Sequence, residues 1–203
     1  MLSKLIFSWF LTWSPLVVSG AIILIILINN LWPNLKFLKK VNTKKLIYIW
    51  LGFTVFFDFL LSVLQYFTWK SSAMGHFFLP PFTSINYFLR YSFFHFWLAN
   101  LISFVCAFGL YFIFKLLQKY RAEIISQNEL LLILLSSLLV AWPKIIIFVP
   151  VFFLMTLVFT LINLVVYKKS ENSLIWPLIF SLIITFLAGS YLINLLSLST
   201  LII

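Results

Sequence analysis

An almost continuous apolar stretch from Leu130 to Tyr167 limits the possible folds of this chain more than any other feature. It holds 38 residues, and a straight helix of that length would extend about 57 Å, nearly twice the roughly 30 Å of a bilayer core. Trp142-Pro143-Lys144 lies near its middle and supplies both its only charge and a helix breaker. We therefore expect the chain to turn back there, with one apolar helix on each side. The alternative is one bent helix, which would give five membrane spans in total and place the C-terminus inside.

The whole chain has the composition of a membrane protein. Of its 203 residues, 64% are hydrophobic and 9% are charged, whereas about a quarter of the residues of a soluble domain carry charge. A helix needs about 20 apolar residues to cross a bilayer, so six such helices fit. We predict an all-α polytopic integral membrane protein whose single transmembrane domain covers residues 1–203. The expected spans are residues 16–32, 46–68, 92–114, 126–142, 147–167 and 174–197.

Two remaining segments have the character of the membrane interface. Residues 1–15 carry Trp9 and Trp13 four positions apart, on one face of a helix, and tryptophan is enriched at membrane interfaces. Residues 69–91 are rich in aromatic side chains and contain Pro80-Pro81, so they are too apolar for a solvated loop and unsuited to one long helix. We predict that residues 1–15 lie at the interface, and that residues 69–91 lie at the interface or dip partway into the membrane against the helices.

The distribution of positive charge predicts the orientation. Ten of the fourteen Lys and Arg residues fall in the connections 33–45, 115–129 and 168–172. Because cytoplasmic loops are enriched in Lys and Arg, these connections are expected inside and both termini outside. The expected location is a bacterial cytoplasmic membrane, with the inner membrane of an organelle as the alternative. Contact with anionic headgroups explains the positive charge without nucleic acid, so the expected partners are the lipid bilayer and other membrane proteins or further copies of this chain.

Asp58 is the strongest candidate for a functional residue. It lies near the middle of the second predicted span and is the only carboxylate in any apolar run. Inserting an ionisable group at that depth of a membrane costs about 2.5 to 3.5 kcal/mol on insertion scales. Thr54, Asp58, Ser62 and Gln65 lie within about 80° of one another on a helix, so they form one polar stripe. This stripe could line a proton or cation path, or it could bind a neighbouring helix.

Other polar and small residues recur at helical spacing. Thr156, Thr160 and Asn163 form a second stripe, and Asn100 and Ser103 a lesser pair, all typical of hydrogen bonds between membrane helices. Small residues repeat every fourth position in two predicted spans, which predicts that these spans are interior. They are Ala99, Ser103 and Ala107 in one span and Ser181, Thr185 and Gly189 in the other.

The sequence offers little for catalysis. It holds four acidic residues, its five glycines are isolated, and no zinc-protease or nucleophile-elbow motif occurs. His76 and His95 match no ligand spacing that would predict a metal or haem site, so no cofactor and no metal are expected. We therefore expect a non-enzymatic structural, assembly or accessory subunit of a membrane complex. The alternatives are a small transporter or channel component that uses Asp58, and a membrane enzyme that uses the two histidines at the outer interface.

Overall fold

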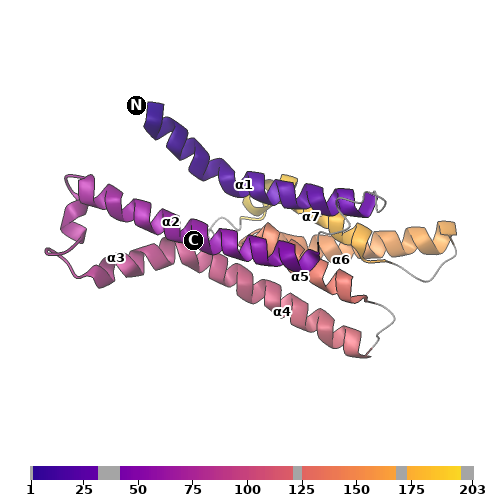
Figure 1. The fold of residues 1–203 in the computed structure, drawn as a ribbon. Coiled ribbons are helices and arrows are strands. Elements are labelled where there is room, and N and C mark those ends of the chain that lie inside the picture. Colours follow the sequence, from indigo (N-terminus) through magenta and orange to yellow (C-terminus); the bar gives the residue numbers. More distant parts are fainter. Residues whose placement is uncertain (1, 32–41, 121–124, 168–172, 198–203) are drawn as a thin grey trace. The chain divides into compact units, whose positions relative to one another are not determined.

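The computed structural model describes residues 2–31, 42–120, 125–167 and 173–197, and its regular elements are all helical (Figure 1). The chain divides into two compact units, Met1–Leu46 and Ile47–Ile203. The predicted lysine-rich connections fall largely on residues 32–41, 121–124 and 168–172, which lie outside the described residues. The expectation of an all-α protein is confirmed for the part of the chain that the structure describes.

The first unit consists of α1 (Leu2–Leu31) and the first residues of α2. The sequence predicted an interfacial helix up to residue 15 and a span from residue 16. The structure has one continuous helix through Pro15 instead. Its described apolar part, Trp13–Asn29, is shorter than the 18 residues of a candidate span.

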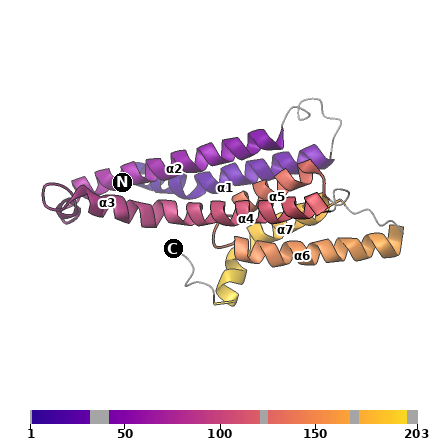
Figure 2. The same ribbon diagram turned by 90° about the horizontal axis from the view of Figure 1, so that it is seen from below.

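The second unit contains the remaining helices (Figure 2). Within the described parts of the chain, four helical runs are long and apolar enough to cross a membrane: Thr43–Ser71, Ile85–Tyr120, Ile145–Val165 and Ile175–Leu195. The elements are α2 (Thr43–Ser71), the 3₁₀ turn η1 (Gly75–Phe78), α3 (Ile85–Ser92), the π-helical turn η2 (Phe93–Trp97), α4 (Leu98–Tyr120), α5 (Gln127–Val140), α6 (Ile145–Ile162), the π-helical turn η3 (Asn163–Tyr167) and α7 (Ile175–Leu195).

The described residues therefore contain four helices that could span a membrane, and the predicted count of six is not confirmed. The predicted spans 46–68, 92–114, 147–167 and 174–197 each fall on one of the four long runs. The predicted break at Trp142-Pro143-Lys144 is confirmed, since α5 ends at Val140 and α6 begins at Ile145. However, α5 has only 14 residues, about 21 Å of helix, which is less than a bilayer core.

Protein encloses α5 on all sides. Every residue from Glu129 to Val140 is buried, and α5 packs against α4 and α7, while α6 packs along α7. A helix that is apolar all round is stable only where its whole surface is covered. Lipid could cover such a helix, but neighbouring helices do so for α5.

At the C-terminal end of α5 the helix stops, and side chains of α2 and α4 form hydrogen bonds with the backbone there. Ala141 adopts a positive φ of 57°, which ends the helix. The last backbone groups of α5 therefore lack the hydrogen-bond partners that a further turn of the same helix would supply. The indole N–H of Trp50 in α2 donates to the carbonyl oxygen of Leu138 at 3.2 Å. The backbone N–H of Trp142 donates to the hydroxyl of Ser103 in α4 at 2.6 Å. Non-helical backbone is tolerated at membrane depth only where protein satisfies it in this way.

At its other end, α5 begins with a buried carboxylate that also binds the start of α7. Ser126 and Glu129 form a capping box, with the Ser126 N–H donating to Glu129 Oε2 at 2.8 Å. The other carboxylate oxygen of Glu129 accepts the backbone N–H of Leu174 at 2.7 Å and the hydroxyl of Ser173 at 3.0 Å. One side chain thus joins two helix N-termini, where the helix dipoles favour a negative charge.

The predicted interfacial segment 69–91 is largely helical. It comprises the end of α2, η1 and the start of the helix that begins at Ile85, so its placement at the interface is not confirmed. The Trp69 ring contacts the rings of Tyr91 and Phe88, with centroids 4.7 and 5.5 Å apart, and these contacts hold α2 against α3. The connection passes so close to Trp69 that a Cβ at Gly75 would meet the Trp69 backbone at 2.8 Å, which explains the glycine.

The small-residue repeats mark buried faces of their helices, but the expectation that the whole helices are interior is wrong for α4, whose other face carries exposed side chains such as Val105 and Phe112. Ser103 and Ala107 of α4, and Ser181, Thr185 and Gly189 of α7, are all buried. Their small side chains let α5 and the α5–α6 turn approach closely.

Candidate functional site

Asp58 lies in the interior of the second unit, and Asn100 of α4 is its hydrogen-bond donor. The Asp58 side chain is 4% exposed. The Asn100 Nδ2 group donates to both carboxylate oxygens, at 2.9 Å to Oδ1 and 2.8 Å to Oδ2. No cation pairs with this carboxylate among the described residues. A buried carboxyl group is thus held by one amide that spans the space between two helices.

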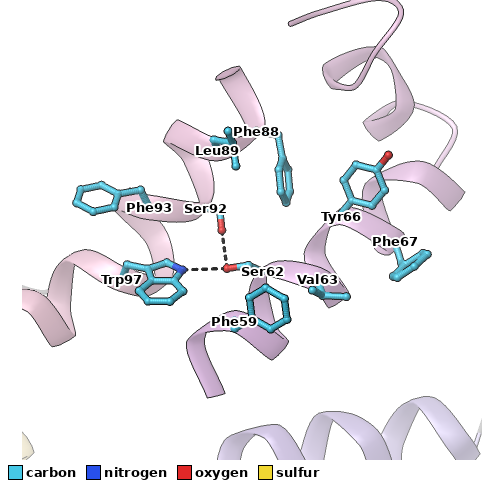
Figure 3. A pocket seen from close by; sticks show the side chains of 10 residues that line it. All are labelled: Phe59, Ser62, Val63, Tyr66, Phe67, Phe88, Leu89, Ser92, Phe93 and Trp97. Carbon is cyan, nitrogen blue, oxygen red and sulfur yellow. Dashed lines mark hydrogen bonds between the residues drawn. The ribbon is translucent and has the colours of Figure 1, made fainter. Parts of the chain in front are cut away.

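One turn further along α2, Ser62 makes a second link to the same long helix (Figure 3). Its hydroxyl accepts the hydroxyl of Ser92 at 2.6 Å and the indole N–H of Trp97 at 3.1 Å. It donates to the backbone carbonyl of Asp58 at 2.8 Å. A hydroxyl has one donor and two acceptor sites, so the hydrogen-bonding capacity of Ser62 is used completely.

The two outer members of the polar stripe make no such link in the structure. Thr54 is buried, with 8% exposure, and its hydroxyl donates to the carbonyl of Leu51 within α2 at 3.0 Å. Gln65 is half-buried, one turn beyond Ser62. The stripe is therefore one face of α2, as the sequence predicts, and its two central members form the polar contact with the helical run Ile85–Tyr120.

An apolar groove adjoins this contact between α2 and the helix formed by α3 and η2 (Figure 3). Its volume is about 580 Å³. Ser62, Ser92 and Trp97 line it together with aromatic and aliphatic side chains of both helices. Asp58 is not among the lining residues, so the groove and the buried carboxyl group are separate features.

Sequence reasoning identified Asp58 but not its partner. Asn100 appeared only as a lesser polar residue beside Ser103. A usable signal was present: Asp58 lies ten residues before the end of the predicted span 46–68, and Asn100 lies eight residues after the start of span 92–114. Two antiparallel neighbours with these positions place both side chains at nearly the same depth. Ser92 and Trp97 carried no comparable signal, because the π-helical turn that brings Trp97 to Ser62 is not legible in the sequence.

The second predicted stripe does not link helices through its hydroxyls. Thr156 donates to the carbonyl of Phe152 at 2.8 Å, and Thr160 donates to the carbonyl of Thr156 at 2.7 Å, both within α6. Asn163 is the first residue of the π-helical turn η3. The hydroxyls are therefore satisfied locally, a common arrangement for Ser and Thr in helices.

The two histidines lie among aromatic rings. His76 packs on Phe77, with ring centroids 4.0 Å apart, and His95 stacks on Tyr91 at 5.2 Å. Within the described ranges, no three His, Cys, Asp or Glu side chains come together in a group that could hold a metal ion. Comparison of the chain with protein-family models, curated proteins and solved structures finds no match.

Proposed function

We propose that this protein is a non-enzymatic structural, assembly or accessory subunit of a membrane complex. The observation that carries the proposal is the use of the α2 polar stripe for contacts within the protein. Asp58 is held by Asn100, and Ser62 is saturated by Ser92 and Trp97. A residue that relays ions needs access to water and a second partner, whereas these hydrogen bonds favour a role in fixing α2 to its neighbour.

The proposed partners are the lipid bilayer and other membrane proteins, including further copies of this chain. Large apolar side chains are exposed along the outward faces of the long helices, such as Val105 and Phe112 on α4 and Leu157 and Leu161 on α6. Lipid or another membrane helix would cover these faces. These exposed apolar faces supply the contact area that an accessory subunit needs to bind other membrane proteins.

The proposed orientation places the lysine-rich connections in the cytoplasm and both termini outside a bacterial cytoplasmic membrane. The six proposed membrane helices are α1, α2, the run Ile85–Tyr120, α5, α6 and α7. The pair α5–α6 does not affect the orientation of the termini, because a hairpin returns to the side it entered whether or not α5 crosses completely.

This orientation predicts the behaviour of reporter fusions. Alkaline phosphatase fused after Ile203 should be active, since it folds only outside the cytoplasm, and green fluorescent protein at the same position should be dark. The same two reporters fused after Lys40 should give the opposite pattern and serve as the control. Fluorescence from the fusion after Ile203 would contradict the orientation.

The subunit proposal predicts that Asp58→Asn remains assembled. An amide at this position can still exchange a hydrogen bond with Asn100, so the tagged variant should co-purify with the same membrane partner, at the same stoichiometry, as the wild type. Helix-to-helix hydrogen bonds in membranes average about 0.6 kcal/mol, so only a small loss of stability is expected. Ser71→Ala, an exposed change on the same helix, is the control.

The same variant tests the alternative of a transporter or channel component. Purified wild type reconstituted in liposomes with a pH-sensitive dye should carry no proton flux above that of empty liposomes. Flux in the wild type that disappears in Asp58→Asn would overturn the subunit proposal and assign ion binding to Asp58.

A further inference from the structure

We propose that the groove between α2 and the α3–η2 helix binds an acyl chain of an anionic phospholipid, whose phosphate lies at Lys70. This site is separate from the proposed subunit contacts. The proposal rests on the shape and lining of the groove, on the hydrogen bonds at its floor and on the charge at its end.

The groove has a buried apolar floor and exposed apolar walls. Phe88 and Ser92 at the floor are 6% and 4% exposed, whereas Phe59 and Leu89 on the two walls are more than half exposed. The volume of about 580 Å³ lies within the range of roughly 300 to 1,000 Å³ that is usual for small-molecule sites. Both walls belong to helices long and apolar enough to cross a membrane, and in a bilayer lipid chains would reach the groove.

The hydrogen bonds at the floor favour a hydrocarbon occupant. The donors of Ser92 and Trp97 are both used by Ser62, and the donor of Ser62 is used by the Asp58 carbonyl. The donors of these three side chains are therefore all used within the protein. If a ligand placed polar acceptor atoms at the floor of the groove, those ligand atoms would find no hydrogen-bond donor. An acyl chain makes no such demand.

Positive charge at one end of the groove favours an anionic headgroup. Lys70 is exposed and lies four residues after Tyr66 and seven after Val63, both of which line the groove, so all three share one face of α2. From Phe59 to Trp97 the chain has two cations and no acidic residue. Tyr66 lies between the apolar floor and Lys70, a position suited to the headgroup region, where tyrosine is enriched.

The π-helical turn η2 borders the groove and shapes it. This turn, Phe93–Trp97, carries the Trp97 side chain to Ser62 and closes the end of the groove opposite Lys70. Single π-helical turns inside longer helices occur frequently at functional sites.

Native mass spectrometry of the full chain in detergent tests the proposal. The probes are palmitoyl-oleoyl phosphatidylglycerol and palmitoyl-oleoyl phosphatidylcholine, titrated separately. The wild type should retain one phosphatidylglycerol more tightly than phosphatidylcholine. Val63→Trp places an indole in the groove and should weaken phosphatidylglycerol binding about tenfold, or about 1.4 kcal/mol, because the indole occupies the volume that the acyl chain would fill. Val105→Trp adds the same volume at an exposed position of α4, outside the groove, and should bind as the wild type does.

Lys70→Gln tests the headgroup separately and changes only an exposed side chain. It should lower the preference for phosphatidylglycerol over phosphatidylcholine about fivefold, which is the effect of one cation near an anionic membrane surface. Equal binding by Val63→Trp and Val105→Trp would overturn the proposed chain site. An unchanged headgroup preference in Lys70→Gln would overturn the proposed phosphate position, and this result is obtained even if Val63→Trp does not fold.

Discussion

Replacing Glu129 by alanine is expected to lower the free energy of unfolding by about 1.5 to 4.5 kcal/mol, a large loss for one substitution. The carboxylate accepts hydrogen bonds from Ser126 at the start of α5 and from Ser173 and Leu174 at the start of α7. Its removal takes away the Glu129 half of the capping box and leaves the buried backbone N–H of Leu174 without an acceptor, while the backbone N–H of residue 129 can still donate to the Ser126 hydroxyl. The lost hydrogen bonds to Ser126 contribute about 0.5 to 1.5 kcal/mol, and a buried donor without a partner costs about 1 to 3 kcal/mol more.

Thermal unfolding of the purified protein in a mild detergent, followed by circular dichroism, measures this loss. Asn128→Ala is the matched control, since Asn128 is the exposed neighbour on the same turn and its change should shift stability by less than about 0.5 kcal/mol. Glu129→Gln should fall between the two, because one amide oxygen replaces two carboxylate oxygens. Equal stability of Glu129→Ala and Asn128→Ala would show that the two helix starts do not depend on this side chain.

The second large effect is expected at Asn100. Asn100→Leu removes the donor to both oxygens of Asp58 and leaves a buried carboxyl group with no partner among the described side chains. We expect a loss of about 2 to 3 kcal/mol, because a buried acceptor without a partner costs its desolvation, and more so when it is charged. The exposed residue Asn86 on the same helical run provides the control Asn86→Leu, which should have little effect.

A double-mutant cycle separates the contact from the cost of an orphaned carboxyl group. Asp58→Leu combined with Asn100→Leu should be more stable than Asn100→Leu alone, since two apolar side chains replace the pair and no polar atom is left unpaired. Equilibrium unfolding in mixed micelles gives the four free energies. Strict additivity of the two single changes would mean that Asp58 and Asn100 do not interact in the folded protein.

The sequence predicted those features that depend on local pattern. The polar stripe through Asp58, the burial of Ser103, Ala107 and the small residues of α7, and the break before Ile145 all follow from helical spacing or from proline. The capping box at Ser126 and Glu129 was not predicted, although its pattern, a serine followed three residues later by a glutamate before an apolar run, is present. Its second role could not be read, because the partner at Leu174 is 45 residues away.

The number of spans could not be settled by hydropathy for a physical reason. An apolar run indicates that a helix is shielded from water, but it does not indicate whether lipid or protein covers that helix. The residues of α5 are as apolar as those of a span, yet helix α5 is only 14 residues long and is covered by other helices. Its end at Ala141 depends on donors and acceptors from α2 and α4, which only the folded chain brings together.

The enclosure of α5 has a consequence for biogenesis. Helix α7 covers one side of α5, and the backbone N–H of Leu174 at its start donates to Glu129 of α5. It is synthesised after α5 and α6. During translation α5 therefore emerges before one of the helices that surrounds it, and it is too short to be stable as an independent span. Until α7 inserts, the insertion machinery or bulk lipid must shelter α5, so a helix that is made later than α5 completes its protein surroundings.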